Sequence, residues 1–174
     1  MLRKWDRGEA LALVLAGALA LPARAAEPVQ TVHIISVDLA AEATLAAVHA
    51  CAAQGYHVSA AVLEPSGLMK AFAKSDGAGP HTKDSALGKA YTVVSLGISR
   101  GEETSAAIAQ RIQSTPGSAA LANVPGILPL AGAVVIRSMG EVVGAIGASG
   151  APGGDKDESC ARAGIEKIKD RLPQ

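Results

Sequence analysis

Aromatic side chains, cysteines and runs of like charge are all scarce in this sequence. Among 174 residues there are one tryptophan, two tyrosines, one phenylalanine and two cysteines, and the 16 basic residues balance the 16 acidic ones. The chain therefore lacks the basic surface with interleaved aromatic rings by which proteins hold nucleic acids. We expect small molecules or proteins as partners and no nucleic acid.

The sequence also lacks an apolar run of the length that a transmembrane helix needs. The run Leu11–Leu21 covers 11 residues, whereas a membrane span needs about 20. It follows a basic start and precedes a small-x-small site ending at Ala25. These features predict a secretory signal peptide over residues 1–25 and no stable membrane insertion after its cleavage. A retained anchor is the alternative.

The predicted mature chain, residues 26–174, has the size of one domain with a proper core. Export would bring it to the periplasm or the exterior, where an even cysteine count favours a disulfide. The sequence thus predicts a disulfide between Cys51 and Cys160, which would close a long loop. Two buried thiols are the alternative. The two cysteines are too far apart in sequence for a local zinc motif.

Apolar periodicity and turn residues predict helices that alternate with β-hairpins. The predicted helices cover residues 38–54, 84–95, 104–113 and 155–171, with a short helical piece at 118–123. The predicted strands cover residues 57–64, 68–73, 130–137 and 141–148. We expect Asp38 to cap the first helix and Gly55 to end it in the left-handed conformation.

The order of these elements predicts the fold class. Hairpins between helices favour an antiparallel sheet over a doubly wound parallel one. We therefore expect a single α+β domain in which helices flank an antiparallel sheet, in a two-layer arrangement of the profilin or PAS kind.

The stretch Gly140–Gly164 joins a strand to a helix through a glycine-rich turn with an acidic cluster. Such a junction is a possible anion site because helix N-termini present free N–H groups. However, the turn contains no complete phosphate-binding or dinucleotide-binding motif. Asp155, Asp157 and Glu158 most simply complement the positive end of the helix, and a calcium site is the other alternative.

Four stretches of the sequence resemble the haem-binding GlcG/HbpS family, also called DUF336. They are residues 51–62 with Gly67, residues 76–93, residues 127–135 and residues 140–164. Gly88 and the Leu130–Ala133 segment depart from the usual family pattern. The resemblance implies a compact α+β domain that often forms oligomers, with haem binding in some members.

Haem needs an apolar slot, an axial ligand and partners for two propionates. We expect His81 to ligate the iron, because it follows Pro80 in a loop before a helix. Lys89, one to two turns further along that helix, is the preferred partner of a propionate. Tyr91 is the third predicted cofactor-binding residue, able to stack on a porphyrin or ligate iron; core packing is its alternative use.

Other side chains are weaker candidates for these roles. His57, His49 and His33 rank below His81 as ligands, and Lys83 and Arg100 rank below Lys89 as cations. No serine lies in the nucleophile motif G-x-S-x-G, which disfavours a covalent hydrolase.

The leading hypothesis is an exported haem-binding protein, periplasmic or secreted, that assembles into a homo-oligomer. A haem-degrading enzyme is one alternative. An oligomeric accessory module that binds no haem is the other, and the scarcity of aromatic rings favours it.

Overall fold

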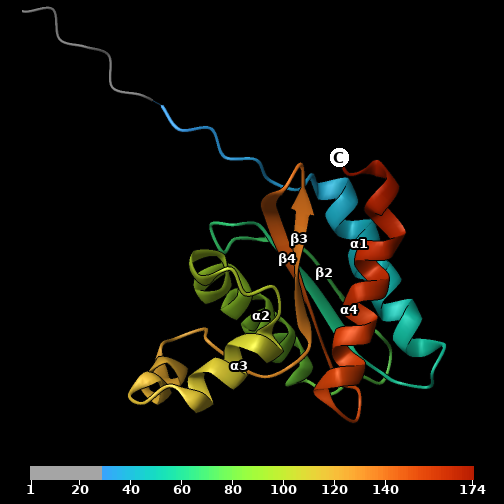
Figure 1. The fold of residues 1–174 in the computed structure, drawn as a ribbon. Coiled ribbons are helices and arrows are strands. Elements are labelled where there is room, and N and C mark those ends of the chain that lie inside the picture. Colours follow the sequence, from blue (N-terminus) through green and yellow to red (C-terminus); the bar gives the residue numbers. More distant parts are fainter. Residues whose placement is uncertain (1–28) are drawn as a thin grey trace, which may run out of the picture. The chain divides into compact units, whose positions relative to one another are not determined.

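A four-stranded antiparallel sheet runs through the computed structural model, which describes residues 29–174 (Figure 1). The strands are β1 (Ser59–Leu63), β2 (Met69–Lys74), β3 (Ala133–Ser138) and β4 (Glu141–Ser149). Their order in the sheet is β2-β1-β4-β3. The two predicted hairpins are thus confirmed, and β1 pairs with β4 to join them. The predicted signal peptide, residues 1–25, lies outside the described residues.

Four α-helices accompany the sheet: α1 (Val37–Ala52), α2 (Thr82–Thr92), α3 (Ser105–Ser114) and α4 (Gly154–Ile168). Shorter turns are a π-helical one at Val93–Gly97 and 3-10 turns at Ile98–Arg100, Ser118–Asn123 and Lys169–Arg171. Within residues 29–174, no helix is long and apolar enough to cross a membrane.

The helices cover both faces of the sheet. Figure 1 shows α1 beside α4 on one side of the strands and α2 with α3 on the other. Alternation along β1 explains this, since Ala60 and Val62 join the core beneath α1 and α4, whereas Ala61 and Leu63 join the core beneath α2. The α+β class and the antiparallel sheet are confirmed, but there are three layers rather than the predicted two.

Side-chain caps fix where two helices begin. The Ser36 hydroxyl accepts a hydrogen bond from the N–H of Leu39 at the start of α1, and the Thr104 hydroxyl accepts one from Ala107 at the start of α3. The predicted cap at Asp38 is therefore wrong, because the helix begins one residue before Asp38 and Ser36 has the extended backbone that a cap requires. Gly55, past the end of α1, has a φ of 79°, which confirms the left-handed conformation predicted for it.

Small side chains bring α1 and α4 close together. Ala43, Ala47 and Gly164 are buried at their contact, and a Cβ at Gly164 would lie 3.2 Å from that of Ala47. The predicted disulfide between Cys51 and Cys160 is present at this contact, with the two Cα atoms 5.5 Å apart and both residues fully buried. It closes a separation of 109 residues, so it restricts the unfolded chain strongly.

Removal of this disulfide should weaken the fold. We expect the double variant Cys51→Ala/Cys160→Ala to lose about 4 kcal/mol of unfolding free energy. The disulfide keeps this loop closed in the unfolded wild type and so lowers the conformational entropy of the unfolded chain. Urea unfolding followed by far-ultraviolet circular dichroism measures the loss. Adding reductant should destabilise the wild type and leave the variant unchanged; equal stability of the two proteins under oxidising conditions would contradict the prediction.

Candidate functional site

The outward face of α2 carries two of the three cofactor-binding residues predicted from the sequence, His81 and Tyr91. His81, Asp84, Gly88 and Tyr91 follow one another at spacings of three or four residues, which places them on one side of a helix. The opposite side holds Ala86 and Ala90, both fully buried against the sheet. The helix thus presents His81 and Asp84 away from the sheet, whereas Gly88, further along this stripe, is buried against Leu128.

A cleft of about 320 Å³ opens along the later part of this stripe. Its walls come from α2, from the end of β1 and from two turns, and its lining residues are Leu63, Gly67, Asp84, Leu87, Gly88, Tyr91 and Gly126. Leu68 and Val124, beside those turns, expose 67% and 47% of their surface. The cleft is therefore mostly apolar, with one carboxylate and one phenol among its lining side chains.

Two glycines from different turns hold the Tyr91 ring. A Cβ at Gly67 would lie 2.7 Å from Cε2 of the ring, and a Cβ at Gly126 would lie 3.0 Å from Cδ1 on its other edge. Both glycines have positive φ, 85° and 84°, a conformation that other residues adopt at a cost. The half-buried ring is consequently fixed in orientation, and it also packs against two clusters of buried residues.

His81 stands at the N-cap position of α2 and is exposed. The helix begins at Thr82, two residues before the predicted start, so His81 is the last residue of the loop rather than part of its middle. Its carbonyl accepts hydrogen bonds from the N–H and the hydroxyl of Ser85. The imidazole lies against Gly79, where a Cβ would be 2.9 Å from its Cε1 atom. The backbone is thus tied down while the imidazole faces solvent.

Lys89 does not lie on this open face, which corrects its predicted role. Its side chain is only 5% exposed, and its Nζ lies 2.7 Å from Oδ2 of Asp157 in α4. The same Nζ donates to the carbonyl of Ala148 at the end of β4. Because position 89 falls on the inner side of α2, the ammonium is used inside the protein and is not available to a propionate.

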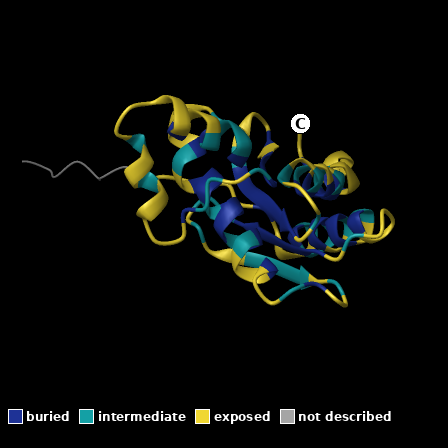
Figure 2. Ribbon diagram, turned by 90° about the horizontal axis from the view of Figure 1, so that it is seen from below, coloured by how far each residue is buried: buried dark blue, intermediate teal, exposed yellow. Residues whose placement is uncertain are grey.

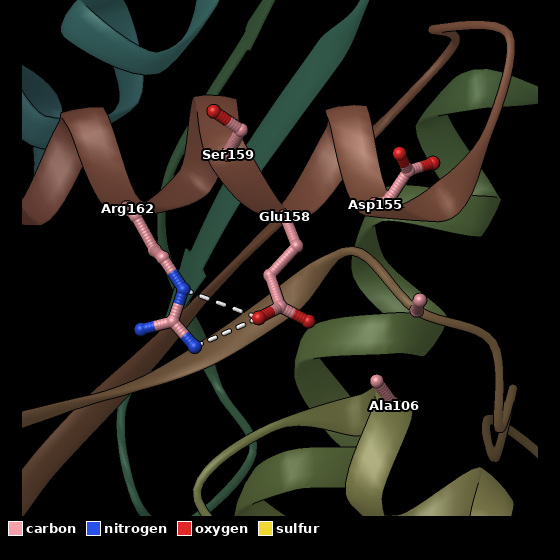
Figure 3. Close-up of a pocket in the computed structure, with 6 residues that line it drawn as sticks. Ala106, Asp155, Glu158, Ser159 and Arg162 are labelled. Atoms are coloured by element: carbon pink, nitrogen blue, oxygen red, sulfur yellow. Dashed lines mark hydrogen bonds and ion pairs between the residues drawn. The ribbon is translucent and has the colours of Figure 1, made fainter.

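The acidic start of α4 is also engaged within the protein. Oδ1 of Asp157 accepts a hydrogen bond from the N–H of Ala151 in the glycine-rich turn. Glu158 forms a two-point ion pair with Arg162, at 3.1 and 2.7 Å, in a pocket that Asp155 and Ser159 also line (Figure 3). The carboxylates that line this pocket disfavour the binding of an anion there. In the described part of the chain, no group of three or more His, Cys, Asp or Glu side chains is arranged to hold a metal ion.

The lower-ranked histidines lie elsewhere. His49 and His57 line a groove of about 370 Å³ between α1 and the end of β2, and His33 pairs with Glu141 at 2.7 Å. The structure therefore brings His81 and Tyr91 to one helix face and separates them from the other histidines and from Lys89. Gly67 and Gly126 can be recognised in the sequence as turn residues. Nothing in the sequence, however, indicates that these two turns contact Tyr91.

Comparison with known proteins finds relatives over most of the chain. Residues 35–166 match the family described as "Haem degrading protein HbpS-like". A double mutant of Streptomyces reticuli HbpS is 37% identical, with a TM-score of 0.71 over 86% of this chain and 97% of that one. No curated protein matches the sequence significantly.

Two more distant structures share the fold. The ORFY protein of Klebsiella pneumoniae, of family DUF336, is 20% identical, with a TM-score of 0.74 over 83% of this chain and 97% of that one. A structure named the PduOC:Heme complex is 17% identical, with a TM-score of 0.67 over 78% of this chain and 95% of that one. At these identities the likeness concerns the fold alone.

Removing one partner of the buried ion pair should be costly. We expect Lys89→Met to lower the unfolding free energy by about 3–5 kcal/mol, because Asp157 is left buried without its counter-charge. Urea denaturation measures this. Lys89→Met/Asp157→Asn should recover most of the loss, since the amide can still accept from Ala151. The control Lys83→Met changes an exposed lysine of the same helix; similar losses in Lys83→Met and Lys89→Met would refute the assignment.

Proposed function

The chain belongs to the HbpS-like family, and on this premise we propose that it binds haem on the outward face of α2, with His81 as the axial ligand of the iron. The observation that carries the proposal is the apolar cleft at Tyr91, which lies on the same side of α2 as His81. When bound, haem supplies reversible ligand and electron chemistry at its iron.

The residues of the cleft fit such a group. Its volume falls within the range of sites for small molecules and cofactors, about 300–1,000 Å³, and Leu63 and Leu87 provide apolar walls. Neutral imidazole is a common haem ligand, and the imidazole of His81 is exposed and free of side-chain capping duties. The fixed Tyr91 ring supports the same use.

We also propose that the mature protein acts outside the cytoplasm, in the periplasm or as a secreted protein. The signal-like residues 1–25 support this. A buried disulfide supports it independently, since disulfides persist mainly in oxidising compartments. Homo-oligomer formation stays a prediction, consistent with the exposed Val37 and Leu45 on the outer face of α1.

A haem-degrading activity is the second candidate. It is favoured by the description of the matching family, "Haem degrading protein HbpS-like". Binding and degradation differ in the fate of the loaded haem: a bound haem keeps its Soret band when ascorbate or peroxide is added, whereas a degraded one loses it and releases iron. An oligomeric module without haem would give no saturable Soret change at all.

His81→Ala should abolish or shift the Soret band of the haem-loaded protein, because the iron loses its protein ligand. The measurement is a haem titration of the purified chain, followed by absorbance. His57→Ala is the matched control, as His57 lines the separate groove behind α1, and it should titrate like the wild type. An unchanged spectrum and affinity in His81→Ala would remove His81 as the ligand.

A second pair of variants tests the position of the cleft. Gly67→Ala and Gly55→Ala impose the same strain, since φ is 85° and 79°, but only Gly67 has the Tyr91 ring within 4 Å. We therefore expect both to lose about 1 kcal/mol of stability from the backbone and only Gly67→Ala to bind haem more weakly. Equal haem affinities of the two variants would argue against this cleft.

A further inference from the structure

We propose that the Tyr91 hydroxyl is the hydrogen-bond donor to a haem propionate, so that α2 holds the iron at its N-terminal end and a carboxylate of the ligand near its C-terminal end. This inference rests on the proposed haem-binding function. It assigns to Tyr91 the role that the sequence suggested for Lys89.

The cleft has few hydrogen-bond donors for an anionic group. Lys89 is committed to Asp157 and Ala148 inside the protein. Among the side chains that line the cleft, those of Leu63 and Leu87 have no polar atom and that of Asp84 is an acceptor when ionised. The Tyr91 hydroxyl is therefore the side-chain donor that the described cleft offers to an anionic group.

The Tyr91 hydroxyl is fixed in place and donates to no other group in the described residues. Gly67 and Gly126 confine the two edges of the ring, which fixes the direction of the C–O bond. No hydrogen bond joins the hydroxyl to another group in the described residues, and it is not among the buried atoms that lack a partner. A pre-oriented donor facing solvent loses little freedom when a carboxylate binds it.

The negative charge of Asp84 makes the two ends of the stripe different for an anionic group. Asp84 lines the same cleft as Tyr91, but it lies one turn after His81 and seven residues before Tyr91, or about 10 Å along the helix axis from Tyr91. A carboxylate at this place disfavours propionates near the His81 end by like-charge repulsion. The same helix face thus selects one orientation, with the iron toward His81 and the propionates toward Tyr91.

The test compares two ligands and two proteins. Iron protoporphyrin IX and its dimethyl ester differ only at the propionates, and Tyr91→Phe removes only the hydroxyl. We expect Tyr91→Phe to bind haem about tenfold or more weakly, as befits the loss of a hydrogen bond to a charged acceptor, and to bind the dimethyl ester as the wild type does. Its Soret maximum should not move, because the iron ligand is unchanged.

Tyr56→Phe is the control, since Tyr56 packs beneath Lys156 away from the cleft and should alter neither affinity. An equal loss for both ligands in Tyr91→Phe would show a packing role and overturn the inference, as would an unchanged affinity for haem. A shifted Soret band would make Tyr91 an iron ligand and overturn it too. Absence of haem binding in the wild type would instead refute the proposed function.

Discussion

The buried ion pair between Lys89 and Asp157 is the interaction on which the arrangement of the helical layers depends. Lys89 belongs to α2 on one face of the sheet and Asp157 to α4 on the other, and their remaining hydrogen bonds reach Ala148 and Ala151 at the end of β4. Taking two charges out of water costs free energy that their attraction offsets only in good geometry. The pair therefore contributes little net stability but strongly disfavours any other docking of the two helices.

This constraint determines which side of α2 faces outward. Once Lys89, Ala86 and Ala90 are turned inward, His81 and Tyr91 must lie on the outer side, because they are related by the helical repeat. Figure 2 shows strands that are mostly buried at the centre of the molecule and exposed segments around them. The disulfide between Cys51 and Cys160 has a comparable effect on the opposite layer, where it joins α1 to α4. Together the two links hold the layers that carry the helix face on which we propose haem binding.

Local sequence patterns predicted much of the fold. The two hairpins and the helices were found within a few residues of their bounds, since apolar periodicity and turn residues act over short distances. The start of α2 was misplaced because Thr82 and Lys83 carry no strong start signal, and the cap of α1 was misplaced because Ser36 and Asp38 both suit that role. In the candidate site, the exposure of His81 follows from its loop position and its role as iron ligand stays a prediction, whereas the role given to Lys89 was wrong because its partner lies 68 residues away.

The sequence by itself was sufficient to predict the α+β class, the two hairpins and the disulfide between the two cysteines. It also identified the family, whose name refers to haem. Only the tertiary structure decided that β1 pairs with β4, that helices cover both faces, that Lys89 is buried and that Tyr91 is held between two glycines. The physical reason is the range of the forces involved. Backbone propensities and periodicity depend on neighbouring residues. A buried ion pair, or the contact of an aromatic ring with two turns, forms only when distant segments meet and exclude water.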